Sequence, residues 1–283
     1  MRILLTGSGG FVGKNLKEYF CTEHELLTPR SFELNLIEQN QVETFFNHNK
    51  IDFIIHCGSV GGYRIQKDKD TTIENNLAMV KNLLKYKREN CRVILFGSGA
   101  MYDKNRSLDK VKESEIGHFI PKDLYGKSKL EISKIVCGRD DILCLNIFGC
   151  YGKYEKETRF PTYAITQNLN NQKITINQNV IFDYIYIDDL CRIIEYFIGH
   201  KPANKIINVT PDKSISLLEI ANLVNEIGKN KTEIEVLNPV MGNQYTGSNA
   251  LLKTELKDFK FTDYKTGLIE LFNFIKDGIY EKN

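Results

Sequence analysis

The amino-acid sequence predicts an α/β protein with a doubly wound parallel sheet and a smaller C-terminal α/β lobe. Two observations carry this prediction. The chain opens with a strand-like run, a glycine turn and a helix-like run, and as far as about Asn146 short apolar runs alternate with amphipathic helical ones. Strands that alternate with helices form a parallel sheet with helices on both faces. After Asn146 the regular alternation lapses, which marks the smaller lobe.

The first predicted element is the apolar strand Arg2–Thr6, which leads through Gly7, Gly10 and Gly13 into the helix-like run Lys14–Phe20. These glycines would allow a tight turn, close approach of the backbone to a pyrophosphate, and close packing of helix on strand. The phosphate would lie at the helix N-terminus. A glycine triplet alone is weak, with an ordinary turn as the alternative, but the order strand, turn, helix predicts a Rossmann-type dinucleotide site.

The same alternation continues through the next seven elements. Apolar runs predict strands, and amphipathic runs predict the helices between them. In chain order they are strand Leu26–Thr28, helix Gln39–Phe46, strand Phe53–His56, helix Thr72–Arg88, strand Val93–Phe96, a helix that carries Tyr125, and strand Ile142–Leu145.

The rest of the chain mixes loops with fewer regular elements. It contains the segment Ile185–Leu190, a helix with the capping box Ser216–Glu219, and a closing amphipathic helix over about Lys265–Lys276. Residues 1–150 are therefore predicted to form the dinucleotide-binding domain, and residues 151–283 mainly the substrate-binding lobe. A return of about residues 180–210 to the first domain stays open.

The composition is that of an ordinary globular chain. Of 283 residues, 42% are hydrophobic and 26% charged, enough for a substantial core. The formal net charge is only +2, and the lysines and arginines are spread along the chain rather than clustered. Both observations argue against a groove that binds nucleic acid. No apolar stretch nears the roughly 18 residues that cross a bilayer, and the N-terminus enters a strand rather than a signal sequence. We expect a cytoplasmic protein.

The seven cysteines and five histidines show no metal-ligand spacing. The number of cysteines is odd, no Cys-x-x-Cys pair occurs, and most cysteines lie in apolar runs such as Ile142–Leu145. Buried reduced thiols are expected, without a disulfide framework, and nothing in the sequence indicates a metal site.

Tyr125 and Lys129 lie four residues apart and therefore on one face of the predicted helix. The ammonium favours the phenolate, so such a pair can give or take a proton near neutrality. On its own the pair is also common on solvated helix surfaces. Beside a glycine turn that binds a dinucleotide, it indicates proton transfer coupled to the cofactor.

Six segments that occur in order along nearly the whole chain carry a family resemblance. They are Thr6–Gly13, Asp52–His56, Gly97–Tyr102, Tyr125–Lys129, Asn146–Gly149 and Phe182–Asp189. Together they resemble the extended short-chain dehydrogenase/reductases of the NAD-dependent epimerase/dehydratase family, which modify nucleotide sugars. Within it, the chain is most similar to the GDP-fucose synthases, through Glu33–Leu36 and Ser59–Gly62. The joint match is more specific for the family than for the substrate.

The resemblance implies three catalytic residues. Ser98 would hydrogen-bond the substrate oxygen, and Tyr125 would protonate the alkoxide as hydride arrives from the nicotinamide. Lys129 would hold the nicotinamide ribose and assist the tyrosine. For Ser98 alone, a turn residue between glycines is the alternative. The further cofactor contacts implied are Gly7, Gly10, Phe11, Val12, Gly13 and Gly58, with Asn35 and Leu36 beside the adenine.

Cofactor choice depends on the segment that follows the second strand, Leu27–Phe32. An acidic residue there would bind a free ribose hydroxyl, whereas an arginine would accommodate a 2′-phosphate. Arg30, with no acid before Glu33, favours NADP(H), and NAD(H) is the alternative. An ordinary surface arginine is the alternative interpretation of Arg30.

Departures from the family pattern narrow the reaction. Dehydratases carry an Asp-Glu pair after the serine, where this chain has Gly99 and Ala100. The cysteine and histidine that fucose synthases use for epimerisation are Ala100 and Thr158 here. Neither can abstract a proton next to a carbonyl. Hydride transfer without epimerisation is what remains.

A further departure concerns the diphosphate of the substrate, because the arginine of the family's Arg-Asp-Phe triplet is Phe182 here. Arg159 and Arg192 are predicted to supply the missing charge, since a guanidinium binds phosphate in bidentate fashion; ordinary surface positions are the alternative. Asn146, at a strand end, is predicted to contact the substrate. A buried asparagine that caps its own turn is its alternative.

The sequence therefore predicts an NADPH-dependent reductase of a nucleotide-linked 4-keto-6-deoxy sugar, a hexose or heptose, for surface polysaccharide, with a GDP-linked substrate favoured. One alternative is a 4-epimerase with tightly bound NAD, against which Arg30 counts. Another is a non-catalytic dinucleotide-sensing scaffold, against which the intact Ser98, Tyr125 and Lys129 count. A homodimer through the helices near 72–88 and 125–136 would follow the family habit.

Overall fold

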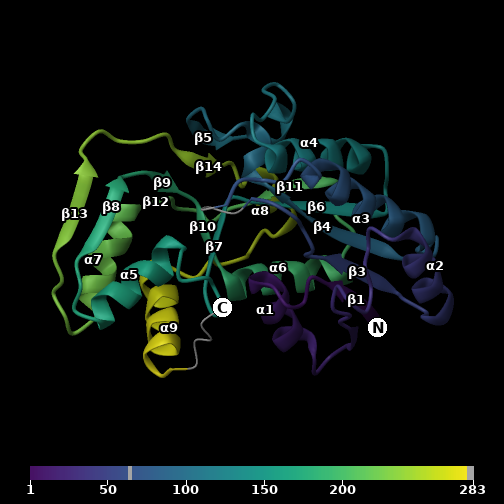
Figure 1. The fold of residues 1–283 in the computed structure, drawn as a ribbon, viewed down its shortest axis with the longest axis horizontal. Helices are drawn as coiled ribbons and strands as arrows, with labels where there is room; N and C mark the ends of the chain where they lie inside the picture. Colours follow the sequence, from purple (N-terminus) through teal and green to yellow (C-terminus); the bar gives the residue numbers. More distant parts are fainter. Residues whose placement is uncertain (63–65, 279–283) are drawn as a thin grey trace.

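The computed structural model describes residues 1–62 and 66–278. Two parts lie side by side in Figure 1, a larger one built on a six-stranded sheet and a smaller one of short strands and helices. The predicted α/β class with a doubly wound parallel sheet is confirmed. Across these two ranges, no helix combines the length and the apolarity needed to cross a membrane.

The six-stranded sheet is parallel throughout, in the order β11-β6-β4-β3-β1-β2. Its strands are Arg2–Thr6 (β1), Glu25–Leu27 (β2), Phe53–His56 (β3), Arg92–Ser98 (β4), Ile142–Ile147 (β6) and Ile206–Val209 (β11). Successive residues of a strand point to opposite faces. Ile3 and Leu5 therefore pack into one buried cluster, whereas Leu4 between them packs into another.

Helices cover both faces of this sheet, as the two clusters require. Residues of α1 (Phe11–Phe20) and α6 (Ile187–Gly199) belong to the cluster of Ile3 and Leu5. Residues of α2 (Gln39–His48), α3 (Thr72–Tyr86) and α4 (Leu124–Cys137) belong to that of Leu4. Figure 1 shows the two sets on opposite sides of the strands.

The predicted elements up to residue 147 are present, with ends that differ by a few residues. β11 was not among them; it pairs with β6 in parallel, so residues 206–209 extend the sheet at one edge. α6 was not anticipated either, because its start follows directly on the strand β10 (Tyr184–Tyr186) within the irregular segment. The domain division between residues 150 and 151 stays a prediction.

The smaller part contains three helices that pack on one another, α5 (Phe160–Leu169), α7 (Leu217–Ile227) and α9 (Tyr264–Lys276). The predicted capping box of α7 is confirmed: the Glu219 N–H donates to the Ser216 hydroxyl at 3.1 Å and the Ser216 N–H to the Glu219 carboxylate at 2.8 Å. The remaining helical elements are α8 (Ala250–Glu255) and the short 3-10 helices η1 (Gly99–Tyr102) and η2 (Glu113–Glu115).

Short strands join the two parts. The smaller part holds the parallel pair of β8 (Ile174–Gln178) and β13 (Ile234–Asn238), and β10 pairs with β7 (Gly149–Tyr151). A four-stranded sheet has the order β12 (Ile215–Ser216), β9 (Ile181–Phe182), β14 (Tyr245–Gly247) and β5 (Leu108–Val111). Since β5 follows β4 and η1 in the chain, this small sheet begins beside the carboxyl end of the large one.

All seven cysteines are free thiols. Cys91, Cys144 and Cys191 are buried, as expected, while Cys21 and Cys137 are exposed because they lie where helices end at the surface. Burial raises the pKa of the Cys144 thiol to about 12, so this thiol stays protonated at neutral pH.

Candidate active site

The glycine turn after β1 is tight enough to require glycine at two positions. Gly7 has a φ of +72°, and a Cβ added to it would lie 2.6 Å from the Gly58 nitrogen. A Cβ on Gly13 would lie 2.2 Å from the Gly7 carbonyl oxygen. At Gly10 the nearest atom would be 3.4 Å away, so that position is less crowded. The turn thus brings the chain after β3 and the start of α1 into backbone contact with the end of β1.

The start of α1 is suited to an anion. Its N-cap is Gly10, which has no side chain to bond the first N–H groups of the helix. Those groups belong to Phe11, Val12 and Gly13, and helix geometry gives them no partner within the helix. Such N–H groups, together with the positive end of the helix dipole, bind phosphate. The residues predicted to contact the pyrophosphate are therefore assembled at one point.

Arg30 lies over the same turn. Its guanidinium carbon and nitrogens are 3.1 to 3.3 Å from the position of a Cβ on Gly9, although the side chain itself is exposed. The Arg30 N–H donates to the Glu33 carboxylate at 2.7 Å, which shapes the loop after β2. A positive charge is thus held beside the turn in an otherwise open position.

Asn35 and Leu36, predicted beside the adenine, lie one loop further on. The Asn35 side-chain oxygen accepts from the Ile37 N–H at 3.2 Å. Leu36 is buried, and its carbonyl accepts from the Asn82 side chain at 2.9 Å. Both residues shape this loop by their own hydrogen bonds, so adenine contact by either stays a prediction.

Tyr125 and Lys129 occupy the first two turns of α4. The Lys129 ammonium is buried, donates to the Phe96 carbonyl at 2.7 Å, and lies 5.4 Å from the centre of the Tyr125 ring. That ring packs against Gly62, on which a Cβ would come within 3.0 Å of it. The two residues therefore share one helical face at the end of β4, with the half-buried phenol toward the loop after β3.

Asp68 fixes the start of α4 to that loop. Its two carboxylate oxygens accept from the Tyr125 N–H and from the Gly62 N–H, each at 2.8 Å. Asp123 caps the helix by accepting from the Gly126 N–H at 2.8 Å. These bonds hold the Tyr125 ring against Gly62. The role of Asp68 was not predicted.

Ser98 is the last residue of β4 and the N-cap of η1. Its hydroxyl oxygen accepts from the Ala100 N–H at 3.2 Å, and the residue is 9% exposed. The hydroxyl of Tyr245, on β14, lies beside Ser98, 2.8 Å from the position that a Cβ on Gly99 would take. Burial raises the pKa of Tyr245, and the proximity of Tyr125 adds to this effect. Ser98, Tyr125 and Tyr245 thus lie together at the carboxyl end of β4.

Tyr245 was missed by the sequence reasoning. It lies in a strand of three residues, far along the chain from Ser98, within a stretch without periodicity. Strands this short carry no pattern from which a neighbour could be inferred. Only the pairing of β14 with β5 brings this tyrosine to the site.

Asn146 lies inside the large sheet. It is fully buried on β6, and its amide donates to the Asn208 side chain at 3.1 Å and to the Tyr102 hydroxyl at 3.5 Å. A Cβ on Gly97 would come within 1.9 Å of its oxygen, so the side chain lies against the strand just before Ser98. Asn146 therefore supports the site from within, and its contact with a substrate stays a prediction.

The two arginines predicted to hold a diphosphate are in different places. Arg192 forms an ion pair with the buried Asp189, donates to the Lys260 carbonyl at 3.0 Å, and lies 4.6 Å from the Phe259 ring. The attraction of Asp189 thus fixes it on α6, and its substrate role stays a prediction. Arg159 is exposed at the N-cap of α5, and its charge slightly opposes the rise in the pKa of Tyr245.

His56 lies under this site as a neutral imidazole. It is buried at the end of β3, 2.7 Å from the Thr6 hydroxyl. Burial, with a contribution from the Lys129 charge, lowers its pKa from 6.5 to about 3. Between these two pH values the unfolded chain binds a proton that the folded chain excludes. The free energy of unfolding should therefore fall as pH decreases from 6.5 toward 3, by at most about 1.4 kcal/mol per pH unit.

We expect His56→Asn to weaken this acid dependence, because asparagine keeps a hydrogen-bonding group near Thr6 and does not titrate. The measurement is urea unfolding at a series of pH values from 7 to 4. The exposed His118 gives the control, His118→Asn, which should keep the wild-type slope. Equal slopes for all three proteins would contradict the neutral buried imidazole.

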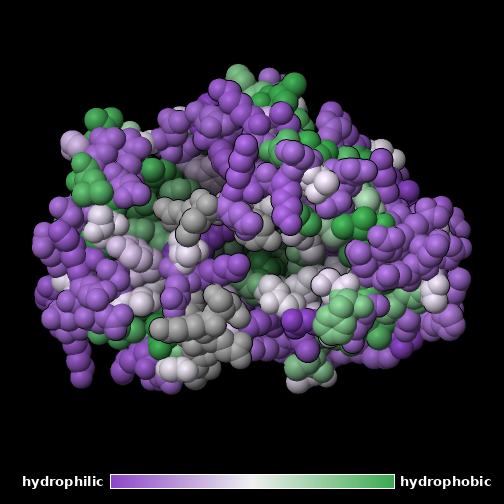
Figure 2. Space-filling model, viewed as in Figure 1, coloured by the Kyte–Doolittle hydropathy of each residue, from purple (hydrophilic) through white to green (hydrophobic). Residues whose placement is uncertain are grey.

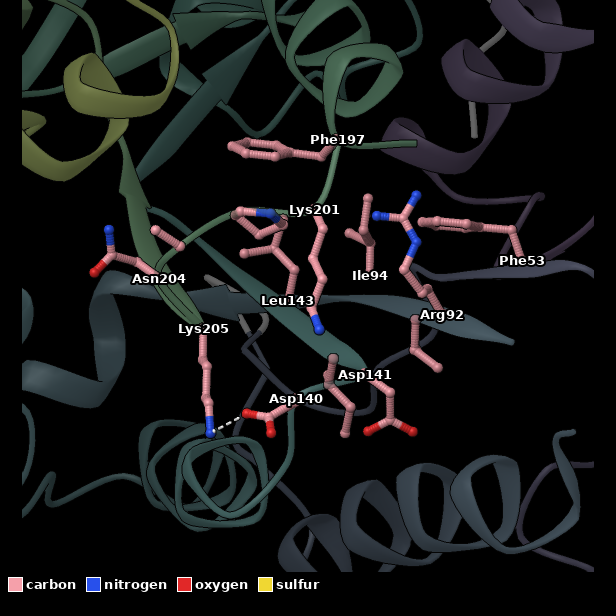
Figure 3. A pocket seen from close by; sticks show the side chains of 14 residues that line it. Phe53, Arg92, Ile94, Asp140, Asp141, Leu143, Phe197, Lys201, Asn204 and Lys205 are labelled. Atoms are coloured by element: carbon pink, nitrogen blue, oxygen red, sulfur yellow. Dashed lines mark ion pairs between the residues drawn. The ribbon is translucent and has the colours of Figure 1, made fainter. Parts of the chain in front are cut away.

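The cavity in Figure 3 lies away from this site. Its lining includes Arg92 and Ile142, the first residues of β4 and β6, whereas Ser98 is the last residue of β4. Lys205 and Asp140 form an ion pair of 2.7 Å at its rim. The space-filling view in Figure 2 shows a separate recess near the middle of its face, at the junction of the two parts.

Comparison with known proteins places this arrangement in a family. A model described as the NAD dependent epimerase/dehydratase family matches residues 3–210. The GDP-L-colitose synthase of Yersinia pseudotuberculosis is 28% identical over 257 residues, covering 80% of this chain and 82% of that protein.

Two solved structures show the same fold. GDP-mannoheptose C4 reductase from Campylobacter jejuni, with NADP bound, gives a TM-score of 0.82 at 18% identity, covering 97% of this chain and 98% of that one. A GDP-L-fucose synthetase from Naegleria fowleri gives 0.83 at 13% identity, covering 100% of this chain and 95% of that one.

Proposed function

The chain belongs to the NAD dependent epimerase/dehydratase family, and we propose that it is an NADPH-dependent reductase of a nucleotide-linked 4-keto-6-deoxy sugar. One observation carries the proposal. Ser98, Tyr125 and Lys129 meet at the carboxyl end of β4, while Gly99 and Ala100, which follow the serine, carry no acid or base. Proton donation to a reduced carbonyl needs the first three alone, whereas elimination of water, or epimerisation by removal of a proton next to the carbonyl, needs a further acid or base.

The glycine turn fits a dinucleotide. Gly13 has its Cα against the Gly7 carbonyl, and the uncapped start of α1 follows at once. Phe11, Val12 and Gly13 would hold the pyrophosphate through their N–H groups. When bound there, the cofactor would supply the hydride. The guanidinium of Arg30 beside Gly9 supports NADP(H), because a 2′-phosphate would meet it as a charge-assisted partner.

Tyr125 would supply the proton. As hydride adds to the keto carbon, the electron pair of the C=O bond moves to oxygen, and the phenol donates its proton to that oxygen. The Lys129 ammonium beside the ring favours the negative charge left on the phenolic oxygen. Ser98 would hydrogen-bond the same oxygen and so stabilise its charge in the transition state. The product would be the alcohol.

The nucleotide end of the substrate would meet Arg159. The residue is exposed at the start of α5, where a helix N-terminus adds to its positive charge. A GDP-linked sugar is favoured because the name of each of the three similar proteins reported above refers to a GDP-linked sugar. The hexose or heptose, the role in surface polysaccharide, the homodimer and the cytoplasmic location stay predictions.

The test is NADPH oxidation with a panel of GDP-, CDP- and TDP-linked 4-keto-6-deoxy sugars, with NADH in parallel. Rapid oxidation of NADPH with one sugar would support the reductase and name its nucleotide. Consumption of neither cofactor with any keto sugar would overturn it. Co-purified NAD with 4-epimerase activity would support the epimerase instead.

Replacing Arg30 with alanine tests the cofactor assignment. We expect kcat/KM for NADPH to fall about 10- to 100-fold, the value of one charge-assisted hydrogen bond, and that for NADH to change little. The measurement is steady-state kinetics with both cofactors. Arg139→Ala is the control, since Arg139 pairs with Asp141 just before the amino end of β6. An equal loss with both cofactors would contradict a phosphate-binding role for Arg30.

A further inference from the structure

Tyr245 brings a second tyrosine hydroxyl to the site from the smaller part of the molecule. Its hydroxyl lies beside Ser98, 2.8 Å from the position that a Cβ on Gly99 would take. Residue 99 has no side chain, so this phenol occupies the space beside the serine that a side chain there would take. Burial is the main cause that raises the pKa of Tyr245, and the nearby Tyr125 phenol raises it further. The Tyr245 hydroxyl therefore keeps its proton at neutral pH.

The Tyr245 ring is held by aromatic packing. Its centre is 5.3 Å from that of Phe148 and 5.7 Å from that of Phe182. Phe148 in turn fits between two glycines, since a Cβ on Gly99 or on Gly247 would come within 2.5 Å of its ring. The ring on β14 is thereby seated against the residue that follows Ser98.

The backbone of β14 is also fixed, by a buried carboxylate. Asp183 is fully buried and accepts from the Gly247 N–H at 2.9 Å, the Ser214 hydroxyl at 2.6 Å and the Lys110 ammonium at 3.0 Å. The Asp183 N–H donates to the Tyr245 carbonyl at 3.3 Å. Removal of the phenol oxygen alone should therefore leave the strand in place.

Hydrogen-bond accounting shows what this phenol can do for Ser98. A serine hydroxyl has two acceptor positions and one proton. The Ala100 N–H uses one acceptor position, at 3.2 Å. A buried phenol that stays protonated can donate to the other. The single Ser98 proton is then left for a third direction, toward a substrate oxygen.

We propose that Tyr245 is a positioning residue of the reductase, which donates its hydroxyl proton to Ser98 and so directs the Ser98 proton to the keto oxygen of the substrate. This inference rests on the proposed function. It adds a residue from the smaller part of the molecule to a site otherwise built on the large sheet. It also explains why residue 99 is a glycine, because a side chain at that position would displace both Phe148 and the Tyr245 phenol.

The test is a double-mutant cycle between Tyr245→Phe and Ser98→Ala, measured as kcat and KM for the keto sugar identified by the panel. In the wild-type background we expect Tyr245→Phe to lower kcat about tenfold, as for loss of one hydrogen bond, and to change KM less than about twofold. In the Ser98→Ala background the same substitution should cost less than about twofold, because its partner is gone. NADPH affinity and melting temperature should stay near wild type.

Tyr264→Phe is the matched control. It removes another partly buried hydroxyl of the smaller part, one that donates to the Lys213 carbonyl at 2.8 Å, and should leave kcat unchanged. An equal fall in kcat in both backgrounds would overturn the positioning role, because the effect would then not act through Ser98. An unchanged kcat for Tyr245→Phe would overturn it as well. A wild-type protein that reduces no keto sugar would overturn the proposed function, and this inference with it.

Discussion

Replacing Tyr125 with phenylalanine is expected to lower kcat for keto-sugar reduction about 10³-fold, within the range attributed to a positioned general acid. The substitution removes the phenolic oxygen and keeps the ring, which packs on Gly62 and lies beside the Lys129 ammonium. Substrate and NADPH binding should change less than about threefold, because no other bond is lost. The measurement is NADPH absorbance under saturating substrate, with KM determined for each ligand.

The matched control is Tyr86→Phe, which removes a tyrosine hydroxyl on α3 that bonds the Glu43 carboxylate at 3.3 Å. It should turn over as the wild type does. A Tyr125→Phe protein that kept more than about a tenth of the wild-type kcat would mean that another group protonates the substrate. Tyr245 would then be the first candidate, and its own variant would separate the two phenols. A non-catalytic scaffold would show turnover in neither protein.

The parts of this site that could be predicted from the sequence depend on neighbours along the chain. Gly7, Gly10 and Gly13 lie within one turn, and Tyr125 and Lys129 within one helix, so their geometry follows from local backbone rules. The same holds for the fold up to residue 147, where strands and helices are long enough to show their periods. Helix α2, for example, begins at Gln39 as predicted.

What could not be predicted depends on contacts between distant segments. Ser98 and Tyr245 meet only because β14 pairs with β5, and neither strand is long enough to show a pattern. Arg192 was predicted to bind a diphosphate because a single sequence does not reveal that the buried Asp189 lies beside it. Asn146 was predicted to contact the substrate because the type of a residue at the end of a strand does not reveal whether its side chain is buried. In each case the deciding partner is set by tertiary packing.

Loss of the glycine at position 13 should abolish tight cofactor binding. In Gly13→Ala the new methyl group would lie 2.2 Å from the Gly7 carbonyl oxygen and 2.7 Å from the Ser8 Cα, both of them backbone atoms. Neither can move without opening the turn, and the N–H groups at the start of α1 would then no longer converge on a pyrophosphate. We expect the Kd for NADPH to rise at least about 100-fold, the loss of roughly two charge-assisted hydrogen bonds. Quenching of tyrosine fluorescence by NADPH measures it, and the melting temperature should fall as well.

Gly10→Ala separates this steric effect from the general cost of losing a glycine. Its Cβ would lie 3.4 Å from the same Gly7 oxygen, an ordinary contact, and Gly10 has a φ of −84°, which alanine adopts freely. Since alanine is a poorer N-cap than glycine by up to about 1 kcal/mol, its melting temperature should fall by no more than about 4 °C. If Gly13→Ala melted at the same temperature and bound NADPH with unchanged affinity, the close packing of α1 on the turn could not be what forms the cofactor site. If both variants bound NADPH more weakly but only Gly13→Ala melted at a lower temperature, the clash at Gly13 would act on the stability of the fold. Binding of the pyrophosphate would then depend on close approach of the backbone at both Gly10 and Gly13.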